Sequence, residues 1–118
     1  MRQSLFLFLT VTLTACASPD AAGKLENAVT SWRATLQLVA EARLKNETGA
    51  GFALKTIDAA IEDLSSQTSA SALPKELVVR AERVIGAAGE LRRAIGSDDR
   101  VGIVRARRAL AEEPARSK

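Results

Sequence analysis

Histidine and tyrosine are absent from this sequence, and cysteine occurs once, at Cys16. A lone cysteine cannot form an intramolecular disulfide, and it cannot build a zinc site made of cysteines. Without histidine the chain also lacks the side chain that most often serves as a general base or a metal ligand. We therefore expect no enzyme activity, no metal site and no cofactor.

Aromatic residues are almost as scarce. The sequence contains only Trp32, Phe6, Phe8 and Phe52. A hydrophobic core then has to consist of Leu, Ile, Val and Ala. A composition rich in Ala, Leu and Arg favours helices packed on helices over a sheet. The 118 residues suffice for one domain with one modest core. These features together predict an all-α fold.

The first fifteen residues have the pattern of a cleaved signal peptide. Arg2 gives a short positive start, and an apolar stretch follows from Leu5 to Leu13. This stretch is about half as long as the ~20 residues that a membrane-spanning helix needs. We therefore predict that residues 1–15 are removed and do not stay in a membrane as a permanent span.

The end of this segment, Leu13-Thr14-Ala15-Cys16, resembles the lipobox of bacterial prolipoproteins, in which an aliphatic residue, a small residue and Ala or Gly precede Cys. The resemblance implies cleavage between Ala15 and Cys16, diacylglycerol on the Cys16 sulfur and a membrane anchor through that lipid. An Asp at the next position would imply retention in the inner membrane. Ala17 stands there instead and implies, by analogy, the periplasmic face of the outer membrane. The alternative is an ordinary secretory signal in which Cys16 is an incidental thiol.

Three regions are predicted behind Cys16. Residues 17–23 form a short tether, and residues 24–113 form the folded domain. Residues 114–118 form a loose tail. The tether is short enough to hold the domain close to the membrane surface.

Apolar residues of the folded domain recur at spacings of three and four, which is typical of helices that bury one face. They predict four helices, near residues 20–46, 51–66, 74–96 and 98–113. The connections are short, which favours an antiparallel bundle of three to four helices. The three clearest stripes consist of Leu25, Val29, Trp32, Leu36 and Val39; of Leu54, Ile57, Ile61 and Leu64; and of Leu77, Ala81, Val84, Ala88, Leu91 and Ile95.

Proline, glycine and asparagine mark the predicted boundaries. We expect Asn46 and the glycines after it to end the first helix, Pro74 to lie in the first turn of the third, and Pro114 to end the fourth. The apolar face of the fourth helix is poorly defined. Gly86 and Gly89 interrupt the third helix, and we expect them to let a neighbouring helix approach closely.

Acidic residues offer no convincing catalytic pair. Asp58 and Glu62 share a helical face, but nothing in their surroundings indicates burial, so we interpret them as solvated. Other acidic residues are placed to form ion pairs along single helices. The predicted pairs are Glu41–Lys45, Glu76–Arg80 and Glu90–Arg93.

Six arginines form the one unusual cluster of the chain. A guanidinium group pairs bidentately with the carboxylates of a protein or with anionic lipid headgroups. The alternative is an exposed face that serves solubility and is partly neutralised by nearby acidic residues, which are Glu90, Asp98, Asp99, Glu112 and Glu113. Nucleic acid is not expected as a partner, because no aromatic residues accompany the arginines. The cluster consists of Arg92, Arg93, Arg100, Arg105, Arg107 and Arg108.

The sequence therefore predicts a lipid-anchored lipoprotein of the cell envelope with a structural or protein-interaction role. Its partners would be the membrane, through lipid on Cys16, and another envelope protein. The alternative function is a small binding module that recognises an anionic ligand or membrane surface with the C-terminal arginines. We expect no small-molecule ligand.

Overall fold

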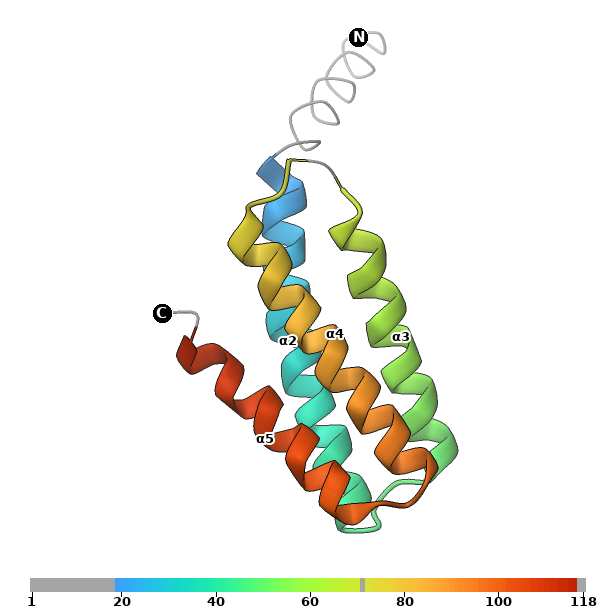
Figure 1. The fold of residues 1–118 in the computed structure, drawn as a ribbon. Coiled ribbons are helices and arrows are strands. Elements are labelled where there is room, and N and C mark those ends of the chain that lie inside the picture. Colours follow the sequence, from blue (N-terminus) through green and yellow to red (C-terminus); the bar gives the residue numbers. More distant parts are fainter. Residues whose placement is uncertain (1–18, 71, 117–118) are drawn as a thin grey trace, which may run out of the picture.

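The computed structural model describes residues 19–70 and 72–116, and these residues contain four helices and no strand. The helices run alternately in opposite directions (Figure 1). They are α2 (Pro19–Leu44), α3 (Ala50–Thr68), α4 (Lys75–Gly96) and α5 (Arg100–Arg116). The predicted all-α antiparallel bundle is confirmed.

The helices α2 and α4 lie at the centre of the arrangement. Each of them packs against all three other helices, whereas α3 and α5 do not contact one another. Figure 1 shows α3 and α5 on opposite sides of this central pair. The fold therefore consists of a shared pair, α2 and α4, flanked by two helices that depend on it independently.

The core is aliphatic, as the composition predicts. Full burial of one large aliphatic side chain contributes about 1.5–3 kcal/mol, so such a core can hold the helices together without a covalent link. Trp32, Leu54 and Ile61 are half-buried and pack against the edge of the core. The largest fully buried side chains are Leu25, Val29, Leu36, Ile57, Leu64, Val84, Leu91, Ile103 and Leu110.

The buried face of α5 includes small residues as well as large aliphatic ones. Ile103, Ala106 and Leu110 are buried at helical spacing, and Gly102 lies beside them. Val101 belongs to the opposite side and is 67% exposed. The sequence pattern is unclear because apolar residues occur on both sides of this helix.

The helices α2 and α4 end with the same backbone motif, a Schellman turn. In α2 the Glu47 N–H donates to the Ala42 carbonyl oxygen (2.7 Å), and in α4 the Asp99 N–H donates to that of Ala94 (2.7 Å). Each turn places one residue in the left-handed region, Asn46 (φ 58°) in the first and Asp98 (φ 55°) in the second. Asn and Asp tolerate this conformation better than most residues, which is why the helices can end here without glycine.

All four helices begin and end within about three residues of the predicted ranges, but three details at their ends differ. The helix α2 begins at Pro19, so residues 19–23 of the predicted tether form its first turns, where Asp20 complements the helix dipole. Pro74 immediately precedes α4 and does not lie within its first turn. The helix α5 passes Pro114 and ends at Arg116, although proline removes one backbone donor there.

The expected role of Gly86 and Gly89 is wrong. Both residues are exposed, and a methyl group added to either would meet nothing within 4 Å. The close approach occurs at Gly102, where an added Cβ would lie 2.9 Å from Ala94 Cβ and 2.7 Å from Asp99 Oδ2. The Asp99 carboxylate also accepts a hydrogen bond from the Gly102 N–H (3.1 Å), which caps the start of α5.

These contrasting glycines give a stability prediction. Gly89→Ala should raise the free energy of unfolding by about 0.5–1 kcal/mol, because alanine costs less backbone entropy in a helix and the site is open. Gly102→Ala should instead lower it by about 1–3 kcal/mol, because the new methyl group overpacks the contact between α4 and α5. Urea denaturation followed by circular dichroism measures both changes. A Gly102→Ala variant as stable as Gly89→Ala would contradict the assignment.

Candidate interaction surface

The residues of the predicted lipid anchor, Ala15 and Cys16, lie outside the described part of the chain. The first described residue is Pro19, three positions after Cys16, and it is already the first residue of α2. Three residues span at most about 11 Å. The start of the bundle is therefore tied closely to Cys16 by the covalent chain.

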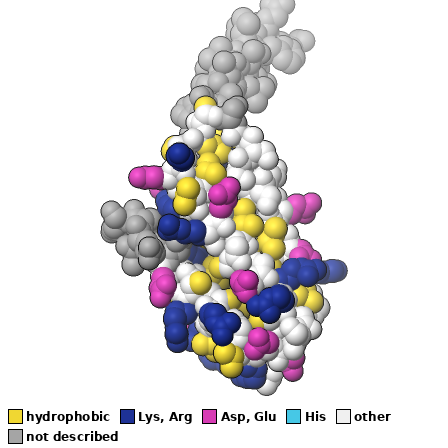
Figure 2. Space-filling view, viewed as in Figure 1, with side chains coloured by type: hydrophobic (Ala, Val, Ile, Leu, Met, Phe, Trp, Pro, Cys, Tyr) yellow, Lys and Arg dark blue, Asp and Glu magenta, His cyan; other side chains and the backbone are white. Residues whose placement is uncertain are grey.

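The six predicted arginines lie at the end of α4 and in the first half of α5. This part of the bundle leads to the turns at residues 45–49 and 97–99, which we call the distal end because Pro19 lies at the opposite end (Figure 1). Figure 2 shows Lys and Arg side chains gathered on the half of the bundle that includes the distal end. The structure thus brings the arginines to one half of the bundle.

Charge is distributed unevenly along the bundle axis. Trp32 and Asp63 lie side by side on α2 and α3, and they mark the middle. Residues 33–62 and 88–116, which form the distal half, contain eleven basic and nine acidic residues. The rest of residues 19–116 contains four basic and five acidic residues. The distal half is therefore formally positive and the other half formally negative.

Two of the six arginines form short ion pairs. Arg92 Nε lies 2.6 Å from Asp58 Oδ1 across the α3–α4 interface, and Arg93 pairs with Glu90 at 2.6 Å within α4. The hydrogen bond and the charge of each carboxylate raise the pKa of the arginine it holds. All four side chains are at least half exposed, so solvent weakens these pairs.

Two further arginines connect α5 to α2. Arg107 approaches Glu41 at 4.0 Å, and the Arg100 guanidinium donates to the Leu44 carbonyl oxygen at the end of α2. Arg100 thus satisfies a carbonyl group that the helix cannot pair internally. These two residues help to position α5.

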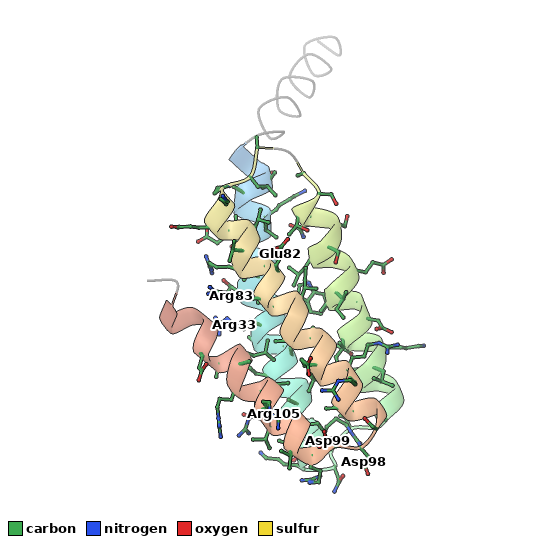
Figure 3. All side chains as sticks on the ribbon, viewed as in Figure 1. Arg33, Glu82, Arg83, Asp98, Asp99 and Arg105 are labelled. Carbon is green, nitrogen blue, oxygen red and sulfur yellow. The ribbon has the colours of Figure 1, made fainter. Side chains whose placement is uncertain are left out.

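The last two arginines of the cluster are Arg105 and Arg108. Both side chains are exposed, and neither has a hydrogen bond or ion pair with any residue that the structure describes. Figure 3 marks Arg105 on α5, close to the turn that Asp98 and Asp99 form. The cluster that the sequence predicts as one unit therefore contains four arginines with a polar contact and two without an ion pair among the described residues.

The ion pairs predicted along single helices are formed in part. Glu90 pairs with Arg93, but Glu41 pairs with Arg107 of α5 instead of Lys45. Asp58 pairs with Arg92 and is 53% exposed, so it remains solvated as expected and does not act together with Glu62.

A polar contact between α2 and α3 was not predicted. The Trp32 indole N–H donates to Asp63 Oδ2 at 2.8 Å, and the Gln67 amide donates to both oxygens of the same carboxylate at 3.2 Å. Trp32 is therefore an interhelical anchor as well as a residue at the edge of the core. No local signal identifies Asp63, because 31 residues separate it from Trp32.

Another polar contact links the two turns of the distal end. Arg43 Nη1 donates to the Thr48 carbonyl oxygen (2.9 Å), and Arg43 Nη2 lies 3.8 Å from Asp98 Oδ1. The Arg43 side chain is only 16% exposed, so it is held inside this end of the bundle. It belongs to the scaffold of the distal end and not to its surface.

The described residues contain no group of three or more side chains suited to hold a metal ion. None of the helices over residues 19–70 and 72–116 is both long and apolar enough to cross a membrane. No protein-family model, curated protein or solved structure matches this chain.

The Trp32 contact gives a second prediction. Trp32→Phe should lower the free energy of unfolding by about 1–2 kcal/mol, because it removes a hydrogen bond to a charged group and leaves the Asp63 carboxylate with fewer donors. Asp63→Asn retains an acceptor for the indole and should cost less. Urea denaturation followed by circular dichroism compares the two. If Asp63→Asn costs more than Trp32→Phe, the indole bond is not the main contribution.

Proposed function

We propose that this chain is the precursor of a lipid-anchored lipoprotein of the cell envelope, with a structural or protein-interaction role and no catalytic activity. The observation that carries the proposal is the lipobox-like sequence Leu13-Thr14-Ala15-Cys16 behind a short apolar segment. The anchor would be acyl chains on Cys16, and the domain would lie at the periplasmic face of the outer membrane. Each buried methylene contributes about 0.8 kcal/mol, so two or more chains give a stable anchor.

The start of α2 supports this arrangement. Because Pro19 lies three residues after Cys16, the bundle would begin directly at the membrane surface. A domain held so closely can meet other proteins of the same membrane and of the space next to it. Exposed apolar side chains are available for such contacts. They are Leu38, Phe52, Val79 and Val101.

The position of the arginines favours a protein partner over the anchoring membrane. Arg107 lies level with Glu41, which is 22 residues along α2 from Pro19. This separation corresponds to about 33 Å of helix. The field of charged headgroups decays over about 8–10 Å at physiological ionic strength. With α2 along the membrane normal, the arginines are beyond the reach of the headgroups to which Cys16 is attached.

The anchor is tested by Cys16→Ser in the full-length chain. We expect the variant to leave the membrane fraction, because the oxygen of serine does not accept the lipid. Ala17→Ser is the matched control, since it changes the neighbouring residue and keeps the thiol; it should remain membrane-bound. Intact mass spectrometry of the native protein should show residues 16–118 with acyl groups on Cys16.

Two results would contradict the proposal. One is a Cys16→Ser protein that remains as firmly membrane-bound as the parent. The other is a native protein that lacks acyl groups. Separation of the inner and outer membranes by density then decides the membrane: recovery with the inner membrane would overturn the outer-membrane assignment alone.

A further inference from the structure

One face of α5 has no partner within the bundle. Val101, Arg105 and Arg108 follow one another at intervals of four and three residues, so they lie along the same side of the helix. All three are exposed, whereas Ile103 and Leu110 on the other side are buried. We call Val101, Arg105 and Arg108 the α5 face.

The two arginines of the α5 face form no ion pair within the part of the chain that the structure describes, and the exposed Glu112 lies one turn after Arg108 on the same side of the helix. The neighbouring Arg92, Arg93 and Arg107 each lie against a carboxylate, but Arg105 and Arg108 have no such contact among the described residues. The surrounding half of the bundle is also formally positive. A guanidinium group binds a carboxylate through two parallel hydrogen bonds, so the complementary ligand is acidic.

The apolar part of the α5 face indicates a protein. Val101 is 67% exposed and lies one helical turn from Arg105. Arginine beside apolar surface is typical of the centre of protein interfaces. A simple anion would bind the guanidinium groups and leave Val101 in water. A protein segment with apolar side chains beside its carboxylates would cover all three residues.

A second copy of this chain does not fit the α5 face. Two copies anchored side by side through Cys16 would have their distal halves at the same height. In a symmetric contact through this face, Arg105 and Arg108 of one copy would oppose those of the other, and like charges at an interface disfavour association. The occupant is therefore a different molecule.

We propose that the α5 face docks an acidic, partly apolar segment of another envelope protein. This inference rests on the proposed lipid anchor, which aligns copies in one membrane and directs the distal end away from it. The four arginines with a polar contact are not part of the docking contact. Their guanidinium groups already lie against Asp58, Glu90, Glu41 or the Leu44 carbonyl oxygen, which leaves Arg105 and Arg108 to recognise the partner.

Site-specific photocrosslinking in native membranes tests the docking. A photoreactive amino acid at Ala109, which is exposed and one turn after Arg105, should crosslink to a protein whose joined peptide contains more Asp and Glu than Lys and Arg. The same group at Ala59, exposed on α3, is the positional control and should not give this product. A crosslink to lipid, to a second copy or to a neutral or basic peptide overturns the proposal, and so does the absence of a crosslink.

Charge variants make the test specific. Arg105→Gln combined with Arg108→Gln should lower the crosslink yield about tenfold, as expected for the loss of about 1.4 kcal/mol of binding free energy. Arg92→Gln combined with Arg93→Gln removes the same charge from arginines that already have partners, and it should change the yield by less than about twofold. Equal loss in both double variants contradicts a specific role for the α5 face.

Two further measurements separate the sources of a negative result. Cosedimentation of the Cys16→Ser protein with vesicles of equimolar phosphatidylglycerol and phosphatidylcholine should show no binding that depends on Arg105 and Arg108. Such binding would overturn the protein partner in favour of a lipid surface. The membrane fraction of each crosslinked sample is assayed in parallel. If the protein is anchored and no acidic segment is joined, the docking proposal fails while the proposed anchor stands.

Discussion

Burial of aliphatic side chains against the central pair α2 and α4 is the constraint on which the rest of the structure depends. The sequence has only one cysteine, so no intramolecular disulfide supplements the core. The core also sets the register between helices that are far apart in the sequence. Trp32 meets Asp63, and Glu41 meets Arg107, only because the stripes interlock at that register. Side-chain position at the surface is thus a consequence of packing inside.

Much of this fold can be predicted from the sequence, because Leu, Ile and Val at spacings of three and four indicate helices that bury one face. The stripes of α2 and α4 are buried almost entirely as predicted. The buried face of α5 escapes this pattern because Gly102 and Ala106 contribute to it, and small residues carry little hydrophobic signal. Glycine is ambiguous for a related reason. Gly86 and Gly89 are exposed, whereas Gly102 lies where α5 contacts α4. Only the packing of the neighbouring helix distinguishes these glycines.

The arginine cluster can be identified from the sequence, but the sequence does not show which of its arginines form polar contacts within the bundle. Whether an arginine is engaged depends on partners that lie far away along the chain. Asp58, 34 residues before Arg92, belongs to another helix, and so does Glu41 beside Arg107. Spacing within a helix correctly predicts Glu90–Arg93, but Glu41 lies 4.0 Å from Arg107 of α5 and forms no ion pair with Lys45 in the described residues. Local sequence patterns therefore predict which arginines lie near one another, while tertiary packing determines which of them form contacts within the bundle.

The separate attachment of α3 and α5 has a consequence for how the bundle opens. Since these two helices do not touch, α5 can detach without disturbing the packing of α3 on α2 and α4. Its departure would expose Ile103, Ala106 and Leu110 together with the parts of α2 and α4 against which they pack. Amide hydrogens of α5 would then exchange through this partial opening, ahead of those in α4. A ligand held on its outer side would raise the free energy of that opening and slow the exchange of the whole helix.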